Sequence, residues 1–255
     1  GEIMPWKDGK PLPFAQLQRR IGRKALGAKI LSEVPVVSIA YDLLEIDRRD
    51  VRGESMAWRR AKLTEVLAAA RAAVFVLSPT VPLTTWDEAR AAFGEARERS
   101  AEGLMLKKLE GTYGVGRRKG GWWKWKVQPF TADAVLIYAQ AGSGRRASLH
   151  TDYTFGVWDK GTLVPFAKAY SGLTDDEIRE LDAWIRKNTL EKFGPVRHVK
   201  HEHVFELGFE GIQPSSRHKS GVAVRFPRIL KWRTDKKPED ADTIETLHAL
   251  MAPTP

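Results

Sequence analysis

The stretch Glu102-Gly-Leu-Met-Leu-Lys-Lys108, followed by Trp122-Trp-Lys-Trp-Lys126, is the most informative part of the sequence for the fold. Each segment is typical of a short strand, and a Gly- and Arg-rich connection joins the two. Because side chains alternate along a strand, Lys124 and Lys126 are expected on one face, and Trp123 and Trp125 on the other. Two neighbouring ammonium groups repel each other, and a bound anion would remove that conflict.

A carboxylate at the start of the first segment, Glu102, could hold a divalent cation against the same anion. Nucleotidyl transfer needs such a set, because cations neutralise charge that builds on the α-phosphate while a metal orients it. The alternative is a solvated face on which Glu102 pairs with Lys124 or Lys126. The residues alone leave both interpretations open.

The net charge of +10 is unevenly distributed. Residues 1–128 carry 24 Lys and Arg against 15 Asp and Glu, whereas residues 129–255 carry 18 against 17. A basic surplus in one half favours a polyanionic partner that docks there, because cations displace counterions from phosphates. A solubilising basic surface is the alternative.

The composition also excludes several classes of protein. No run of about 18 apolar residues is present, so a membrane span is not expected. Residues 1–10 lack the basic and apolar regions of a signal peptide. The absence of cysteine excludes disulfides and thiolate metal sites. The cytoplasm is the expected location.

The pattern of the chain divides near Gln128-Pro129-Phe130, which is typical of a domain junction. Before it, helical patterns cover residues 14–28, 57–73 and 85–100, and strand patterns cover 34–44 and 75–77. After it come five strand-like segments, at 131–141, 150–158, 162–170, 199–209 and 225–232. A helix over 174–188 lies between the third and the fourth, which is the order of an OB barrel.

Several of these segments resemble the motifs of the covalent nucleotidyltransferases, the superfamily of DNA ligases, RNA ligases and mRNA-capping enzymes. Glu102-Gly-Leu-Met-Leu-Lys is similar to motif IV, and Trp122-Trp-Lys-Trp-Lys126 to motif V. Ala40-Tyr-Asp-Leu-Leu44 resembles motif III, where the family's aromatic residue stacks on adenine, which implies that role for Tyr41. Gly1-Glu2-Ile3 resembles an element whose glutamate contacts the ribose or metal.

Near the C-terminus, Arg225-Phe-Pro-Arg228 and Arg233-Thr-Asp-Lys236 resemble the motif VI region of DNA ligases. The resemblance implies that three side chains act on the departing pyrophosphate when the OB domain closes: Arg233, Asp235 and Lys236. Two basic loops are candidates for contacts with DNA phosphates, although plain basic turns remain the alternative. Their residues are Arg117, Arg118, Lys119, Arg217 and Lys219.

The resemblance runs from residue 1 to about 245 and is greatest to the small bacterial ATP-dependent DNA ligases linked to repair. It implies an α+β fold, with a partial nucleotidyltransferase (adenylation) domain at 1–128 and an OB-fold β-barrel at 129–255. It also implies ATP and Mg²⁺ or another divalent cation, with Lys124 and Lys126 on the α-phosphate and Glu102 on the metal. The expected partner is nicked double-stranded DNA, and the expected state is a monomer with no membrane association.

The family's nucleophile is the lysine of a Lys-x-Asp-Gly element, which this sequence does not contain. Lys7-Asp8-Gly9 lacks the spacer and is typical of a hairpin tip. We therefore expect this chain to be a C-terminal piece of a longer ligase. The piece alone is expected to be unable to adenylate itself. The alternatives are an RNA ligase or capping-type nucleotidyltransferase, and a non-catalytic OB-type nucleic-acid-binding protein.

Overall fold

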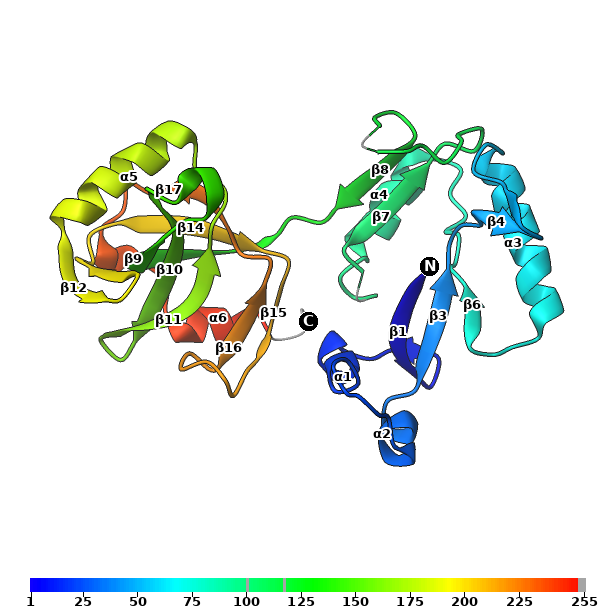
Figure 1. Cartoon of the computed structure of the whole chain (residues 1–255), viewed down its shortest axis with the longest axis horizontal. Helices are drawn as coiled ribbons and strands as arrows, with labels where there is room; N and C mark the ends of the chain where they lie inside the picture. Colours follow the sequence, from blue (N-terminus) through cyan, green and yellow to red (C-terminus); the bar gives the residue numbers. More distant parts are fainter. Residues whose placement is uncertain (100, 117, 252–255) are drawn as a thin grey trace. The chain divides into compact units, whose positions relative to one another are not determined.

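The computed structural model of the chain describes residues 1–99, 101–116 and 118–251. Two compact units make up the chain, Gly1–Val127 and Gln128–Pro255. The sequence-based boundary lies one residue later. Figure 1 shows the elements of each unit, and the units are described separately below. Every helix of the described residues is too short or too polar to cross a bilayer.

The first unit contains a four-stranded sheet in the order β2-β1-β3-β6. These strands are β1 (Glu2–Lys7), β2 (Lys10–Pro11), β3 (Val36–Ala40) and β6 (Phe75–Leu77). β1 runs antiparallel to both β2 and β3, and β3 runs parallel to β6. Asp8 and Gly9 have positive φ angles of 52° and 78°, so Lys7 lies beside a tight hairpin turn.

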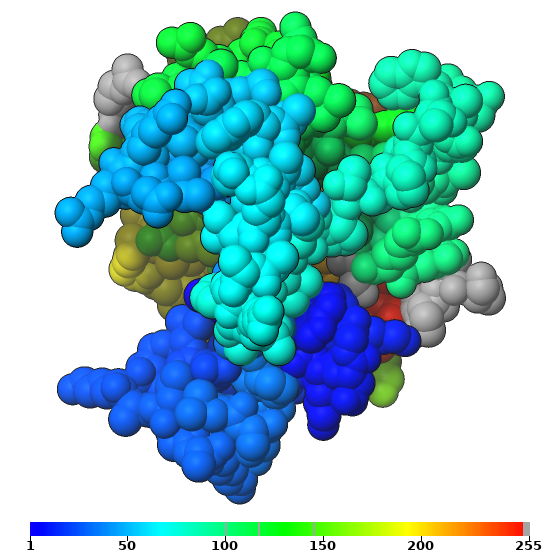
Figure 2. Space-filling view, turned by 90° about the vertical axis from the view of Figure 1, so that its right-hand side faces the viewer, coloured from blue at the N-terminus to red at the C-terminus, as the bar shows by residue number. Residues whose placement is uncertain are grey.

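Four helices accompany this sheet: α1 (Phe14–Gln18), α2 (Ala28–Glu33), α3 (Met56–Ala70) and α4 (Trp86–Gly94). The expected single helix over 14–28 is wrong. Gly22 adopts a φ of +81°, and α2 begins after Gly27. Thr85 and Glu88 form a reciprocal capping box at the start of α4. Helix α3 lies on the surface of the first unit in Figure 2.

Two short antiparallel pairs complete the first unit. β4 (Glu45–Ile46) and β5 (Arg49–Asp50) form one hairpin, and β7 (Gly103–Lys107) and β8 (Trp122–Lys126) form the other. β7 thus falls inside the strand-like stretch Glu102–Lys108, and β8 coincides with Trp122–Lys126. The β7–β8 pair carries the residues that the sequence singles out.

The second unit is a curled barrel built around β9 (Phe130–Ala141), which pairs with β10 (His150–Asp159) and β14 (Val204–Phe209). On its other edge, β10 pairs with β11 (Thr162–Ala169), and β14 likewise pairs with β17 (Arg228–Trp232). Helix α5 (Asp175–Lys187) follows β11 and contributes Leu181 and Ile185 to the buried core. These five strands and the helix have the order and pairing of an OB fold, as expected.

A close approach brings β11 to β17 and closes the barrel on that side. The backbone N–H of Ile229 donates to the Ser171 carbonyl at 2.9 Å. Gly172 has a φ of +114°, and a Cβ there would lie 1.8 Å from the Ile229 carbonyl oxygen. Only glycine can occupy this position.

Two further strand pairs and a terminal helix were not expected from the sequence. β12 (Thr189–Phe193) pairs with β13 (Val196–Val199), which also pairs with β9. β15 (Gly211–Pro214) pairs with β16 (Val222–Arg225), and α6 (Ile244–Ala249) packs Leu247 into the core. The single strand predicted at 199–209 is therefore wrong. This segment contains the end of β13, a bend and β14.

Candidate nucleotide and nucleic-acid site

The register of the β7–β8 hairpin determines which side chains share a face. Lys124 lies opposite Met105, and Lys126 lies opposite Gly103. Directly opposed residues in an antiparallel pair lie on the same face, so both lysines lie beside Met105. On the other face, Trp125 stacks on Phe93 of α4 with ring centres 4.6 Å apart. Trp125 thus anchors the hairpin to α4, and the lysines lie on the opposite face.

Gly103 allows the carboxylate before it to reach this face. Its φ is +131°, and a Cβ would lie 2.0 Å from the carbonyl oxygen of Trp125. Glu102 immediately precedes it, and its Oε2 lies 3.4 Å from Nζ of Lys126. Both side chains are roughly two-fifths exposed, at 43% and 41%. A carboxylate and an ammonium group therefore face each other where solvent and a phosphate can reach them.

Lys107 links this hairpin to the end of β3, a role that sequence reasoning missed. Its Nζ lies 4.9 Å from the ring centre of Tyr41 and 4.2 Å from that of Trp122. Burial lowers the pKa of Lys107 from its ordinary value. Trp122 is its cross-strand partner, so Lys107 shares the face of the other lysines. The contact brings Tyr41 to this same face.

A buried ion pair fixes the backbone next to Tyr41. Asp42 accepts from Arg59 of α3 through both oxygens, at 2.8 Å from Nε and 3.1 Å from Nη2. Arg59 is fully buried and also donates to the Glu54 carbonyl at 2.5 Å. In α3 the buried residues Met56, Arg59 and Leu63 recur at helical spacing, a signal that could have located Arg59.

Glu2 lies at the start of β1 and pairs in register with Ile39 of β3. Ile39 precedes Tyr41 by two residues, so the strand register places Glu2 beside the chain that leads to the aromatic ring. Within the first unit, the structure thus brings Tyr41 to Lys107, which shares a hairpin face with Lys124 and Lys126, and Glu2 lies on the strand next to β3.

The three predicted motif VI side chains form one cluster in the second unit, around an aspartate that sequence reasoning missed. Arg233 donates to Asp235 from Nε at 2.9 Å and from Nη2 at 2.8 Å. Its Nη1 and the Nζ of Lys236 both donate to Asp133, at 3.1 Å and 2.6 Å from Oδ2. The hydrogen bond with Arg233 holds the pKa of Asp235 well below its usual range. The two cations are therefore preorganised on one carboxylate.

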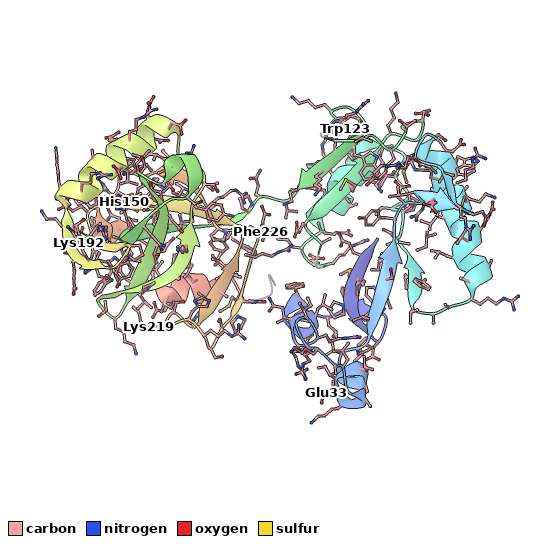
Figure 3. The ribbon with its side chains drawn as sticks, viewed as in Figure 1. Glu33, Trp123, His150, Lys192, Lys219 and Phe226 are labelled. Carbon is pink, nitrogen blue, oxygen red and sulfur yellow. The ribbon has the colours of Figure 1, made fainter. Side chains whose placement is uncertain are left out.

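The candidate DNA-binding residues lie in two exposed loops. Arg118 and Lys119 are exposed between β7 and β8, whereas Arg117 lies outside the described residues. Arg217 and Lys219 are exposed in the loop between β15 and β16, where Figure 3 labels Lys219. This loop is closed by a 2.7 Å hydrogen bond from Ser215 N to the Gly221 carbonyl.

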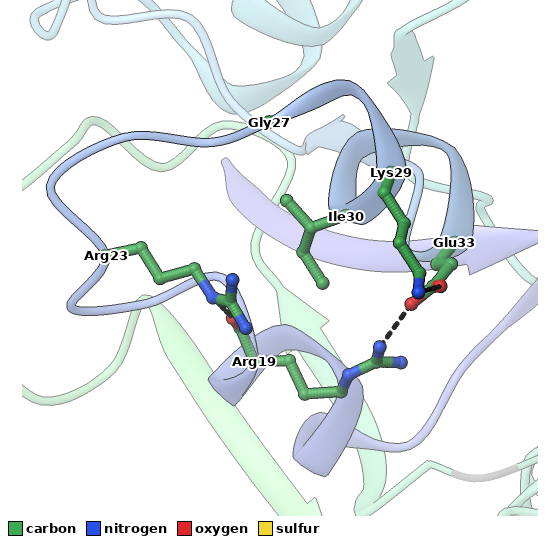
Figure 4. A pocket seen from close by; sticks show the side chains of 6 residues that line it. All are labelled: Arg19, Arg23, Gly27, Lys29, Ile30 and Glu33. Carbon is green, nitrogen blue, oxygen red and sulfur yellow. Dashed lines mark hydrogen bonds and ion pairs between the residues drawn. The ribbon is translucent and has the colours of Figure 1, made fainter.

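A basic pocket of about 410 Å³ lies between α1 and α2, separate from the predicted nucleotide residues. In Figure 4, Arg19 forms an ion pair with Glu33, which also lies 3.9 Å from Lys29. Arg23 donates through Nε to the Arg19 carbonyl at 2.6 Å. The pocket has no aromatic lining, so it lacks the stacking surface that a base requires. Its full lining is Arg19, Arg23, Gly27, Lys29, Ile30 and Glu33.

No cluster of three or more His, Cys, Asp or Glu side chains arranged to hold a metal occurs in the described ranges 1–99, 101–116 and 118–251. Glu102 could therefore contribute one carboxylate to a metal bound on the lysine face. Mg²⁺ commonly uses one or two carboxylates together with substrate phosphates. The residues present fit such a shared site.

Comparison with known proteins gives consistent matches along the chain. The ATP dependent DNA ligase domain family matches residues 1–126, and the ATP dependent DNA ligase C terminal region matches residues 146–236. A probable DNA ligase of Opitutus terrae is 40% identical across 99% of this chain and 28% of its own length. A probable DNA ligase of Koribacter versatilis is 38% identical across 96% and 46%.

The chain thus spans less than half the length of these curated relatives. Among solved structures, Pmar-Lig_PreS3 matches with a TM-score of 0.66 at 16% identity, over 91% of this chain and 50% of that chain. A Lig E DNA ligase matches with a TM-score of 0.55 at 20% identity, over 78% and 64%. At these identities the two structures support the fold alone.

Proposed function

Because this chain belongs to the ATP-dependent DNA ligase family, we propose that the protein carrying it seals nicks in duplex DNA through enzyme-adenylate and DNA-adenylate intermediates. The observation that supports this most strongly is the face shared by Lys107, Lys124 and Lys126, where Lys107 contacts the ring of Tyr41. That face combines an aromatic ring with neighbouring cations, which suits a nucleotide with its base and phosphates.

Lys124 and Lys126 neutralise the α-phosphate in this proposal. Their alternation on one strand makes the two ammonium groups converge on an anion. Adenine stacks on the ring of Tyr41, which Lys107 orients, and Glu2 contacts the ribose. The lysines lie on the β7–β8 hairpin, Glu2 lies on β1, and Tyr41 directly follows β3, so regular backbone positions these side chains before the nucleotide binds.

Glu102 would hold Mg²⁺ or another divalent cation together with phosphate oxygens. A bound divalent cation supplies positive charge that orients and polarises the phosphate. Glu102 also pairs with Lys126 across 3.4 Å, so its carboxylate holds the ammonium group beside the phosphate position.

Arg233, Asp235 and Lys236 act in the first step by exchanging partners. Asp133 accepts from both cations in this structure. We propose that oxygens of the departing pyrophosphate replace the Asp133 carboxylate, while Asp235 continues to orient the guanidinium. A carboxylate and a phosphate are alternative acceptors for the same donors, so the exchange preserves their hydrogen bonds.

The exposed basic loops contact phosphates of the nicked duplex in this account. Arg118 and Lys119 would contribute from the first unit, and Arg217 and Lys219 from the second. Arg117 stays a prediction from the sequence. Such contacts position the protein on DNA without reading its bases.

The sequence contains no Lys-x-Asp-Gly element, so we propose that the AMP-accepting lysine is not in this chain. Incubation with ATP and Mg²⁺, followed by intact mass measurement, should show no AMP adduct on this chain. The whole protein should gain one AMP and seal nicked DNA faster than nicked RNA. Lys124→Ala in the whole protein should abolish the adduct, whereas Lys62→Ala on α3 should not.

An AMP adduct on this chain alone would contradict the proposed location of the nucleophile. Faster sealing of nicked RNA would instead favour an RNA ligase. Adduct formation that survives Lys124→Ala would remove the assigned role of the β8 lysines.

A further inference from the structure

Two histidines of the second unit, neither of which has a role above, bring their outer ring nitrogens close together. His198 lies on β13, and His201 lies in the bend before β14. Their Nε2 atoms are 3.2 Å apart, and their ring centres are 5.2 Å apart. Both residues are half-buried, and Tyr138 of β9 lies beside His198 with ring centres 5.3 Å apart.

The ring geometry has the spacing that shared coordination of a metal ion requires. In a straight N–H···N bond of 3.2 Å the ring centres would be about 5.4 Å apart, because each nitrogen lies about 1.1 Å from its ring centre. Two imidazoles on one tetrahedral ion, with bonds of about 2.05 Å, place the nitrogens about 3.3 Å and the centres about 5.2 Å apart. The observed 3.2 Å and 5.2 Å match the spacing of two imidazoles on one ion, and a slightly bent hydrogen bond between the rings gives the same spacing.

The neighbouring residues leave this pair as the ligand set. His203 belongs to the packed interior, where its ring lies 4.3 Å from that of Trp184 and 4.9 Å from that of Trp232. Glu202 is exposed and lies 3.9 Å from Lys200. A metal ion here would therefore have the two imidazole nitrogens as its protein ligands, and water would fill its remaining positions.

We propose that His198 and His201 form a Zn²⁺ site through their Nε2 atoms. Imidazole is a preferred ligand of zinc, whereas Mg²⁺ prefers oxygen ligands, so the metal of the ligase reaction would not compete for it. The ion would join β13 to the chain that enters β14, and both strands pair with β9. The bound ion would thus stabilise the connection between β13 and β14. This inference does not depend on the proposed function.

The test is a zinc titration of the untagged chain against a chromophoric chelator. The wild type should bind one Zn²⁺, and Mg²⁺ in excess should not displace it. His198→Gln and His201→Gln should each weaken zinc binding at least about tenfold, because each removes one of two ligands. His218→Gln, which changes an exposed loop histidine, should leave the affinity unchanged.

A hydrogen-bonded pair and a metal site differ further in a rescue experiment. His201→Cys supplies a thiolate ligand and should restore zinc binding relative to His201→Gln. Thermal unfolding without metal identifies any variant that fails to fold. The proposal is overturned if the folded wild type binds no zinc, or if both glutamine variants bind it as tightly as the wild type.

Discussion

Asp42 and Arg59 form a buried ion pair in which both carboxylate oxygens accept hydrogen bonds, at 2.8 Å and 3.1 Å. Their side chains are 3% and 0% exposed. The pair ties the residue after Tyr41 to helix α3. It therefore connects the interior of the first unit to the face proposed to bind the nucleotide.

Arg59→Met should destabilise the first unit by about 3–5 kcal/mol, because it leaves the Asp42 carboxylate buried without its partner. Urea unfolding followed by tryptophan fluorescence measures the change. Asp87→Asn, at a 91% exposed side chain, is the control and should have little effect. An unchanged unfolding midpoint for Arg59→Met would show that the pair does not hold this unit together.

Lys107→Met should weaken ATP binding several-fold, because it removes the cation that contacts the rings of Tyr41 and Trp122. Cation–π contacts contribute about 0.5–2 kcal/mol. Lys107→Arg keeps the charge and should retain most of the affinity. Equal affinities for the methionine variant and the wild type would mean that Lys107 does not position Tyr41 for the base.

Acid should weaken the second unit through Asp182, a buried carboxylate of α5. Burial alone would raise its pKa, but hydrogen bonds from Arg186 and His150 outweigh burial and lower it. A carboxyl with a lowered folded pKa stabilises the fold above its unfolded value of about 3.9 and loses this contribution as pH falls through the folded pKa. The stabilisation is thus present at neutral pH and lost in acid.

Asp182→Asn should therefore lower the free energy of unfolding at pH 7 by about 2 kcal/mol, the size of hydrogen bonds to a charged group. The difference from the wild type should shrink as the pH falls below about 4. Thermal unfolding across this pH range provides the measurement. A difference that stays constant with pH would contradict the role of the ionised carboxylate.

The double variant Arg217→Ala/Lys219→Ala should weaken binding of the chain to nicked DNA and reduce its salt dependence. Each lost phosphate contact lowers the slope of log affinity against log salt by about 0.9. Lys192→Ala, at an exposed lysine of β12 in the same unit, is the matched control. If both changes weaken binding equally, the effect is one of general charge and not of this loop.

Local patterns predicted the parts of the fold that depend on neighbouring residues. Alternation along β8 placed Lys124 and Lys126 on one face, and the register confirms that arrangement. The capping boxes at Thr85 and Thr174 are equally local, because capping involves residues three positions apart. The helix over 14–28 was wrong, because the turn at Gly22 interrupts it.

The partners that assemble the candidate site lie far apart in the sequence, and local patterns do not reveal them. Asp133 meets Arg233 and Lys236 across about a hundred residues of chain. Lys107 meets Tyr41 only because the β7–β8 hairpin packs near the end of β3. Such contacts follow from tertiary packing, so the sequence could indicate their chemistry but not their pairing.

Titration of this chain with ATP and Mg²⁺, followed by tryptophan fluorescence, tests the central claim most directly. Trp122 lies on the proposed nucleotide face beside Lys107, so ATP should change its emission in a saturable way. Lys124→Ala should abolish this response, whereas Lys62→Ala on α3 should preserve it. A response that is absent from the wild type, or unchanged by Lys124→Ala, would contradict nucleotide binding on the lysine face of β8.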